Sequence, residues 1–330
     1  MKKTLCVVLA CVMLIGLCAC GNSSQKETEK TPETTQTKVN QDDPAGDDTM
    51  NVLFISNSTS WYFMDELYGM LAAAGHKEFN LCHLYYSGCS LKQHVDFMKG
   101  AEKPYQFKVT NKNGVNITKD MDLETAMGTR NWDYIVTHNN AYSYRSENGE
   151  TAYTETEPYL KELLNFVREK FPLSKYLWTN TWVPNVGYSL SFKMTSVDQR
   201  KRVQEANDRV SQFVKRDFGL DVVPCGKAWS KVRDLEILNT VPAGLDVEKF
   251  TMFTMIINGK ISDDSVHDGD IGGGQYLNAC VWFETLTGES CIGNTYRPRY
   301  DYKGLPLTLD EEKIDILQKA AHEAVEENKK

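Results

Sequence analysis

From residue 51 onward, short uninterrupted apolar runs alternate with longer amphipathic stretches, and this alternation limits the possible fold more than any other feature. The run 52–55 (Val-Leu-Phe-Ile) predicts a strand that is buried on both faces, because no polar residue interrupts it. Further strands are predicted over residues 80–86, 134–137, 176–179 and 220–224. Helices are predicted over residues 64–74, 157–171, 197–218 and 274–287, and a capping box at 308–311 predicts a last helix. Strands that alternate with helices indicate an α/β fold with a parallel sheet.

One interruption of this pattern predicts a local insertion. Asn113-Gly114 stands between alternating residues over 106–118, which is a strong signal for a two-residue hairpin. The chain shows no internal repeat, so we expect one domain over residues 50–330 with a hairpin insertion near 100–131. Hydrophobic residues make up 41% and charged residues 25%, enough for a large core without disulfides. The net charge of −8 argues against a nucleic-acid partner.

The first twenty residues predict where the protein is located. Lys2 and Lys3 precede an uncharged apolar run over 5–17, which is shorter than the roughly 20 residues needed to span a bilayer. This pattern is typical of a secretory signal peptide. Its end, Leu-Cys-Ala-Cys at 17–20, resembles the lipobox of bacterial lipoproteins, which implies cleavage before Cys20 and lipid attachment to Cys20. We therefore expect an extracytoplasmic protein, anchored to the bacterial cell membrane through its lipid only.

The next segment and the remaining cysteines exclude several other classes. Residues 21–49 contain no aromatic residue and one branched aliphatic, Val39, so we expect a disordered linker. Five cysteines then remain in the domain, with no CxxC pair among them: Cys82, Cys89, Cys225, Cys280 and Cys291. Their odd number and spacing indicate neither a disulfide framework nor a zinc site. We expect buried free thiols, with a Cys82–Cys89 bond as the alternative, and no metal or cofactor.

Polar residues gather at the predicted carboxyl ends of the strands, where open parallel sheets bind their ligands. They occupy residues 56–60, 87–90 and 138–140, and a later loop over 263–269 adds an Asp and a His. Hydroxyls, a glycine, amides and an Asp/His pair are what a serine esterase requires: a nucleophile, oxyanion donors, a base and an orienting carboxylate.

The order of these blocks resembles the SGNH, or GDSL-like, hydrolase superfamily, over about residues 51–293. The most similar branch is an uncharacterised bacterial group with Gly-Asn-Ser, Gly-Cys-Ser-Leu-x-x-His and Asp-x-x-His blocks. The matching stretches here are Ser-Asn-Ser at 56–58, Gly-Cys-Ser-Leu-Lys-Gln-His at 88–94 and Asp-Ser-Val-His at 264–267. The resemblance implies a three-layer, flavodoxin-like fold, with a parallel sheet of about five strands and helices on both faces.

The same resemblance implies a role for each matching residue. Ser58 would be the nucleophile, His267 the general base and Asp264 the carboxylate that orients His267. The oxyanion would be bound by the backbone N–H groups of Ser58 and Gly88 and by the side-chain amide of Asn139. Within residues 138–140, which follow the predicted strand 134–137, Asn140 and His138 are alternatives to Asn139.

Three departures from the pattern keep other interpretations open. Ser56 stands where the pattern has glycine, and Thr59 stands where it has phenylalanine. Residues 138–140 read His-Asn-Asn, where the superfamily has Gly-x-Asn-Asp and the similar branch a block that contains glutamine. Ser58 could instead cap the following helix, and His267 could be an ordinary loop histidine.

We predict a cofactor-independent serine esterase for acyl esters, including acetyl esters on a carbohydrate. Its partners would be a small-molecule or glycan ester, with aromatic residues such as Trp61 and Tyr62 available either to stack on sugars or to pack in the core. The alternative is a non-catalytic surface lipoprotein of the same fold that binds a glycan or another ligand.

Overall fold

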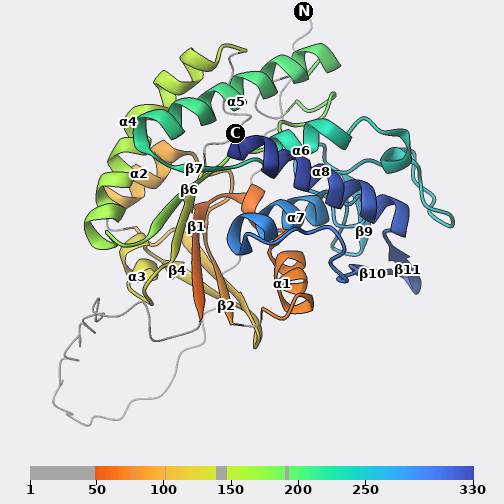
Figure 1. The fold of residues 1–330 in the computed structure, drawn as a ribbon, viewed down its shortest axis with the longest axis horizontal. Coiled ribbons are helices and arrows are strands. Elements are labelled where there is room, and N and C mark those ends of the chain that lie inside the picture. Colours follow the sequence, from red (N-terminus) through yellow and green to blue (C-terminus); the bar gives the residue numbers. More distant parts are fainter. Residues whose placement is uncertain (1–48, 77, 101, 139–146, 190–192) are drawn as a thin grey trace, which may run out of the picture. The chain divides into compact units, whose positions relative to one another are not determined.

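The computed structural model describes residues 49–76, 78–100, 102–138, 147–189 and 193–330, which belong to one compact unit (Figure 1). Cys20, the linker residues before 49, and the amides Asn139 and Asn140 lie outside the described residues. In the part of the chain that the structure describes, no helix is both long enough and apolar enough to cross a bilayer.

A central seven-stranded sheet forms the middle layer of the described unit, in the order β4-β3-β2-β1-β5-β6-β7. Five neighbouring strands, in the order β2-β1-β5-β6-β7, are parallel to one another. These five are β1 (Met50–Ser56), β2 (Phe79–Tyr85), β5 (Tyr134–Thr137), β6 (Lys175–Thr179) and β7 (Asp221–Val223). Counted along the chain, their order is 2-1-3-4-5, which is the flavodoxin-like order. The predicted fold class is confirmed.

The predicted hairpin supplies the remaining two strands. β3 (Tyr105–Asn111) and β4 (Gly114–Met121) are antiparallel, and β3 extends the sheet beside β2. Gly114 has a φ of 93° at the turn, a conformation that glycine adopts without steric cost. The hairpin is therefore part of the main sheet rather than an appendage to it.

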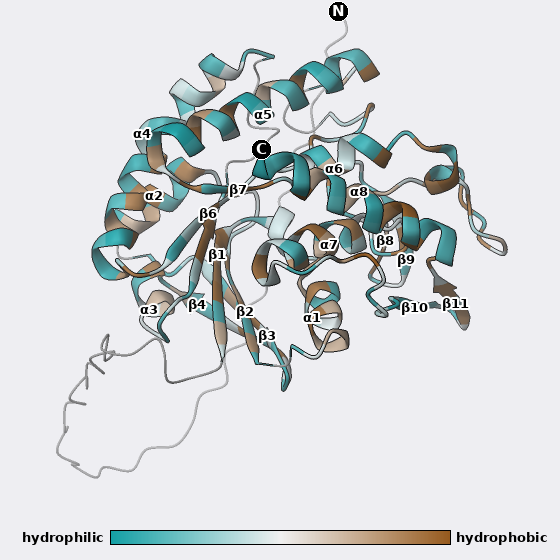
Figure 2. Ribbon diagram, viewed as in Figure 1, coloured by the Kyte–Doolittle hydropathy of each residue, from teal (hydrophilic) through white to brown (hydrophobic). Residues whose placement is uncertain are grey.

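Helices cover both faces of the sheet (Figure 1). One apolar cluster combines β1 with α1 (Met64–Ala73), α6 (Cys225–Val232), α7 (Gly274–Thr287) and α8 (Glu311–Lys329). The opposite cluster combines it with α2 (Leu91–Lys99), α3 (Leu123–Met127), α4 (Gly149–Lys170) and α5 (Val197–Phe218). Within β1, Val52 and Phe54 join the first cluster, whereas Leu53 and Ile55 join the second. Burial on both faces explains why residues 52–55 of this strand are all apolar (Figure 2).

Two predicted helix starts are wrong. α4 begins at Gly149, eight residues before the predicted start at 157, because the Asn148 side chain accepts hydrogen bonds from the N–H groups of Glu150 and Thr151. The capping box at 308–311 does not form. Asp310 caps α8 by accepting a hydrogen bond from the N–H of Lys313. Residue 308 instead ends a strand.

Two short hairpins that the sequence analysis missed lie beside the main sheet. They are β8 (Thr254–Ile257) with β9 (Lys260–Asp263), and β10 (Arg299–Tyr302) with β11 (Leu305–Thr308). Four-residue strands are too short for a clear alternating pattern. A signal was nevertheless present, because Asn258-Gly259 has positive φ at both positions, as a type I′ turn requires.

The five cysteines of the described residues are free and buried, as expected, and Cys82 does not pair with Cys89. Two 3-10 helices complete the description: η1 (Ser58–Ser60) and η3 (Glu236–Asn239).

Candidate active site

The register of the parallel strands brings the first three polar blocks to one edge of the sheet. Ser56 at the end of β1 pairs with Tyr85 at the end of β2, and Ile55 pairs with Thr137 at the end of β5. The chain segments that follow these three strands therefore start side by side. They carry Ser58, Gly88 and His138, respectively.

Ser58 occupies the first position of η1, directly after β1. The cap of this short helix is Asn57, whose side chain accepts a hydrogen bond of 3.1 Å from the N–H of Thr59. The interpretation of Ser58 as a helix cap is therefore wrong. Ser58 is 6% exposed, and the described residues offer its hydroxyl no hydrogen-bond partner. The Ser58 hydroxyl is therefore available to interact with a ligand.

Asn57 also joins the three blocks to one another. Its Nδ2 donates to the carbonyl of Cys89 at 2.9 Å, and its Oδ1 accepts from the hydroxyl of Thr59 at 2.9 Å. Because that hydroxyl donates to Asn57, it must accept from Nε2 of His138, which lies 3.1 Å away. Gly88 precedes Cys89 in an exposed turn with a φ of 63°. The network fixes the position of Ser58 relative to both neighbouring loops.

Asp264 and His267 form a hydrogen-bonded pair on the loop after β9. Oδ2 of Asp264 accepts from Nδ1 of His267, while its Oδ1 accepts from the backbone N–H groups of Val266 and His267 at 3.0 and 2.9 Å. Burial alone would raise the pKa of Asp264, but these hydrogen bonds and the His267 ring hold the pKa below its usual value. With Nδ1 donating to a carboxylate, Nε2 is the nitrogen of His267 that can accept a proton.

Tyr62 connects this pair to the segment that begins at Ser58. Its ring packs edge-on against the His267 ring, with 5.2 Å between their centroids. Burial, with the negative charges of Asp268 and Asp264 nearby, raises the pKa of Tyr62 to about 12. No hydrogen bond joins Ser58 to His267 among the described residues, and in ligand-free enzymes such a bond is often long. The Asp264–His267 pair thus packs against the segment that carries Ser58.

The sequence analysis did not predict the burial of Asp268, which directly follows His267. Asp268 is completely buried, and its Oδ2 accepts a hydrogen bond from Nδ2 of Asn278 at 3.0 Å. The Oδ1 of Asn278 in turn accepts a hydrogen bond from Nε1 of Trp229 at 2.9 Å. The other carboxylate oxygen of Asp268, Oδ1, has no partner among the described residues. Burial raises the pKa of Asp268 to about 7. Its position directly after the Asp-x-x-His block is the signal that could have drawn attention to it.

Ser56 and His83 form a second, deeper Ser–His pair. The Ser56 hydroxyl and Nε2 of His83 share a hydrogen bond of 2.7 Å, and the two residues are 1% and 0% exposed. Burial, with positive charge from Lys108, lowers the pKa of His83 well below its usual value, so the ring is neutral. The side chain that replaces the glycine of the SGNH pattern therefore has its own partner. Thr59, which replaces phenylalanine, has one too.

Residues 51–324 match the model of a family described as a domain of unknown function (DUF4886). The chain belongs to the DUF4886 family.

One solved structure shares the fold of this chain, and others are more distantly similar. A DUF4886 protein from Bacteroides uniformis is 24% identical, with a TM-score of 0.65, and the match covers 86% of this chain and 96% of that one. A lipase/acylhydrolase from Enterococcus faecalis is 13% identical, with a TM-score of 0.42 and coverage of 73% and 96%. A protein from Slackia heliotrinireducens, whose description proposes an SGNH hydrolase, is 15% identical, with a TM-score of 0.42 and coverage of 72% and 99%. No curated protein matches the chain.

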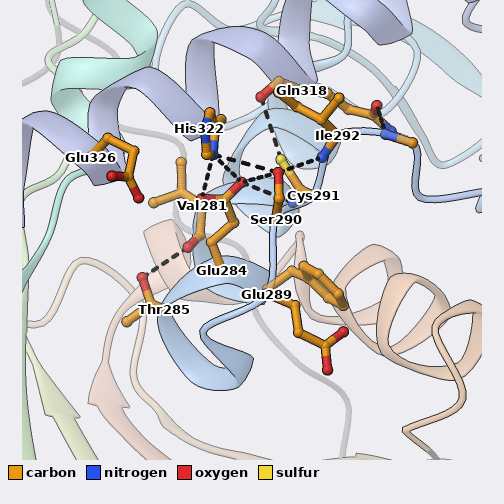
Figure 3. Close-up of polar contacts among 12 residues, drawn as sticks. Val281, Glu284, Thr285, Glu289, Ser290, Cys291, Ile292, Gln318, His322 and Glu326 are labelled. Atoms are coloured by element: carbon orange, nitrogen blue, oxygen red, sulfur yellow. Dashed lines mark hydrogen bonds and ion pairs between the residues drawn. The ribbon is translucent and has the colours of Figure 1, made fainter.

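This DUF4886 chain contains another serine and histidine close together, here with an acid, away from the strand ends (Figure 3). Glu284 on α7 accepts from the N–H of Cys291 at 2.8 Å and lies 3.1 Å from Nδ1 of His322 on α8. Ser290 Oγ lies 3.5 Å from that same Nδ1. A triad needs the serine and the carboxylate on opposite ring nitrogens. The grouping therefore holds the end of α7 to α8 and does not form a catalytic triad.

Side chains that could ligate a metal are scattered over the described part of the DUF4886 domain. Among the residues placed by the structure, no three His, Cys, Asp or Glu side chains are grouped so that they could bind a metal ion.

Proposed function

We propose that this DUF4886 protein is a serine esterase that hydrolyses acyl esters, with Ser58 as nucleophile, His267 as general base and Asp264 as the residue that orients His267. The observation that carries the proposal is the Asp264–His267 pair, which packs through Tyr62 against the segment that starts at Ser58. The blocks at 56–58, 88–94 and 264–267, which resemble those of SGNH hydrolases, support the same assignment.

In the proposed reaction, Oγ of Ser58 attacks the ester carbonyl while Nε2 of His267 takes its proton. The backbone N–H groups of Ser58 and Gly88 stabilise the resulting oxyanion, and Asn139, outside the described residues, is proposed as the third donor. In other hydrolases one such donor is worth about 10²–10³ in kcat. His267 then protonates the leaving alcohol, and a water molecule activated by the same histidine releases the acid from Ser58.

Short acyl groups such as acetyl are the proposed acids, and a carbohydrate is the proposed alcohol. We also retain the proposal that the protein is exported and anchored through a lipid on Cys20. This predicts that the protein from bacterial cells partitions into the detergent phase of Triton X-114, whereas the Cys20→Ser variant does not. Equal partitioning of the two proteins would refute lipid attachment at Cys20.

A non-catalytic lipoprotein that binds a glycan or another ligand is the second candidate. The observation in its favour is that no hydrogen bond links Ser58 to His267 in the described part of the chain.

The decisive test is ester hydrolysis by the full chain, with a fluorophosphonate probe as a second readout. We expect the unmodified protein to hydrolyse 4-nitrophenyl acetate and to gain one probe adduct, located on Ser58 by peptide mass spectrometry. The Ser58→Ala variant should lose activity by about 10³-fold or more and should gain no adduct.

Ser56→Ala is the matched control, because it removes the hydroxyl of the buried Ser56–His83 pair two residues away. It should still be labelled on Ser58. Activity that survives in Ser58→Ala but disappears in Ser56→Ala would overturn the proposed nucleophile. A folded chain with no activity on any acyl ester and no labelling would favour the binding protein.

A further inference from the structure

A pocket of about 530 Å³ is lined by Tyr62, whose ring packs against that of His267. One wall is the segment after Ser58, including Trp61, Tyr62 and Glu66, and the opposite wall comes from β10 and the β8–β9 turn. The two short hairpins outside the main sheet therefore complete this pocket. Its volume lies within the range of about 300–1,000 Å³ that is typical of small-molecule sites.

Two lining residues connect the pocket to the catalytic loop. Tyr62 lines the pocket and also packs against the ring of His267. Gln275 lines it as well, and its Nε2 donates to the carbonyl of Asp268 at 3.1 Å, directly after His267. The pocket therefore shares Tyr62 with the surroundings of His267, and Gln275 with those of Asp268.

Glu66 on α1 presents a hydrogen-bond acceptor to the pocket. It is 5% exposed, and its Oε1 accepts from the hydroxyl of Tyr300 on β10. No hydrogen bond from the described residues reaches its second oxygen, Oε2, so this atom can accept one from a molecule in the pocket. Burial raises the pKa of Glu66 to about 7 and that of Asp270 to about 6, so near neutral pH these carboxyl groups can both donate and accept.

The charges in the lining favour an uncharged ligand. Asp65 pairs with Lys108 at 3.1 Å, so these two charges offset each other. Arg299 adds a positive charge and Asp270 a negative one. The lining thus carries no large excess of either charge that would attract an anion or a cation, and a neutral ligand needs no compensating charge.

The remaining lining residues supply flat apolar surface. Trp61, Tyr62, Tyr296 and Tyr300 all contribute to the walls. Aromatic faces pack against C–H groups, while the carboxyl, amide and guanidinium groups around them exchange hydrogen bonds with hydroxyls. Apolar faces combined with neutral donors and acceptors match a ring that carries several hydroxyl groups.

We propose that this pocket binds the uncharged, hydroxyl-rich part of the substrate, a sugar ring or a similar polyol, and that Glu66, held by Tyr300, selects for it. The proposal rests on the esterase function proposed above, because it makes the pocket the alcohol subsite of the Ser58 reaction.

Direct binding to the full chain tests the pocket without any need for turnover. Methyl glycosides of glucose, galactose, mannose and xylose serve as probes in saturation-transfer NMR, with cyclohexanol as a ring of similar size that carries one hydroxyl. We expect at least one glycoside to bind and cyclohexanol to bind at least tenfold more weakly. Glu66→Gln keeps an oxygen for Tyr300 but removes the second acceptor, and it should weaken glycoside binding at least fivefold.

Glu124→Gln is the matched control, because Glu124 is exposed on α3 and pairs with Lys170 instead. It should bind the glycoside as the unmodified protein does. The proposal is overturned when no glycoside binds, or when Glu66→Gln and Glu124→Gln bind equally well. Thermal melting of both variants verifies that they are folded.

Kinetics separate this proposal from the esterase function. The ratio of kcat/KM for a monoacetylated methyl glycoside to that for 4-nitrophenyl acetate should fall at least tenfold in Glu66→Gln. If no acyl ester is hydrolysed but glycoside binding depends on Glu66, the pocket assignment stands and the esterase proposal fails. If 4-nitrophenyl acetate is hydrolysed through Ser58 but no glycoside binds, the esterase stands and the pocket assignment fails.

Discussion

The carboxylate of Asp264 accepts a hydrogen bond from Nδ1 of His267, three residues further along the same loop. Two backbone N–H groups hold the other oxygen of the carboxylate, so its orientation is fixed by its own loop. This arrangement sets the tautomer of His267 without help from a distant part of the chain.

Replacing Asp264 with asparagine tests this relationship. The amide would still fill the space, but it cannot hold the His267 tautomer in the same way, so we expect kcat for 4-nitrophenyl acetate to fall by about 10²–10⁴. KM should change far less, because Asp264 does not contact the substrate in the proposed reaction. Stopped-flow or steady-state kinetics give both values. Asp246→Asn, at an exposed position, is the control, and equal kcat in the two variants would contradict the proposed role.

Asn57 is expected to support both stability and activity, because its side-chain amide both donates and accepts hydrogen bonds. Asn57→Asp retains an oxygen for Thr59 but loses the donor to the carbonyl of Cys89, and it places a charge at a buried position. We expect the free energy of unfolding to fall by about 1–3 kcal/mol and kcat to fall at least tenfold. Urea denaturation and the ester assay measure the two effects. A variant with unchanged stability would show that the link to Cys89 is dispensable.

Asp268 should make the stability of the protein depend on pH. Its pKa is about 7 in the folded chain and near 3.8 in the unfolded chain. Between these values the unfolded chain has released a proton that the native chain still holds, so the free energy of unfolding falls as pH rises from about 4 to about 7. One pKa unit corresponds to about 1.4 kcal/mol, which gives an upper limit on the order of 4 kcal/mol for this shift.

Asp268→Asn removes this titration, and its unfolding free energy should fall less than that of the unmodified protein over the same pH range. Glu66 and Asp270, whose pKa values are also raised, keep part of the slope in the variant. Urea denaturation at pH 4, 5.5, 7 and 8 provides the comparison. Parallel profiles for the two proteins would mean that Asp268 is already ionised in the folded chain at low pH.

Glu284 is expected to act on stability alone. Glu284→Ala leaves the N–H of Cys291 and the His322 ring without their shared acceptor. The free energy of unfolding should fall by about 1–3 kcal/mol, while kcat per folded molecule stays the same. Loss of kcat in a protein that remains folded, as judged by circular dichroism, would assign this grouping a role in the reaction.

Much of the fold could be predicted from local sequence. The double-sided burial of 52–55, the apolar stripe of α5 and the Asn113-Gly114 turn each depend on neighbouring residues only. The prediction failed where the local signal was short, as in the four-residue strands of the two small hairpins. It also failed where two residues could both cap a helix, because Asp310 caps α8 in place of residue 308.

The candidate site likewise has one part that could be predicted from the sequence and another that could not. The pairing of Asp264 with His267 was expected from the resemblance of the block at 264–267 to the SGNH pattern, and a spacing of three on one loop allows the two side chains to meet. Only the tertiary structure decided that Asn57 rather than Ser58 caps η1, that Ser56 pairs with His83, and that Glu66 meets Tyr300 across a pocket. These last contacts join residues from separate strands, helices and hairpins. They depend on sheet register and on how the hairpins pack, which no local pattern encodes.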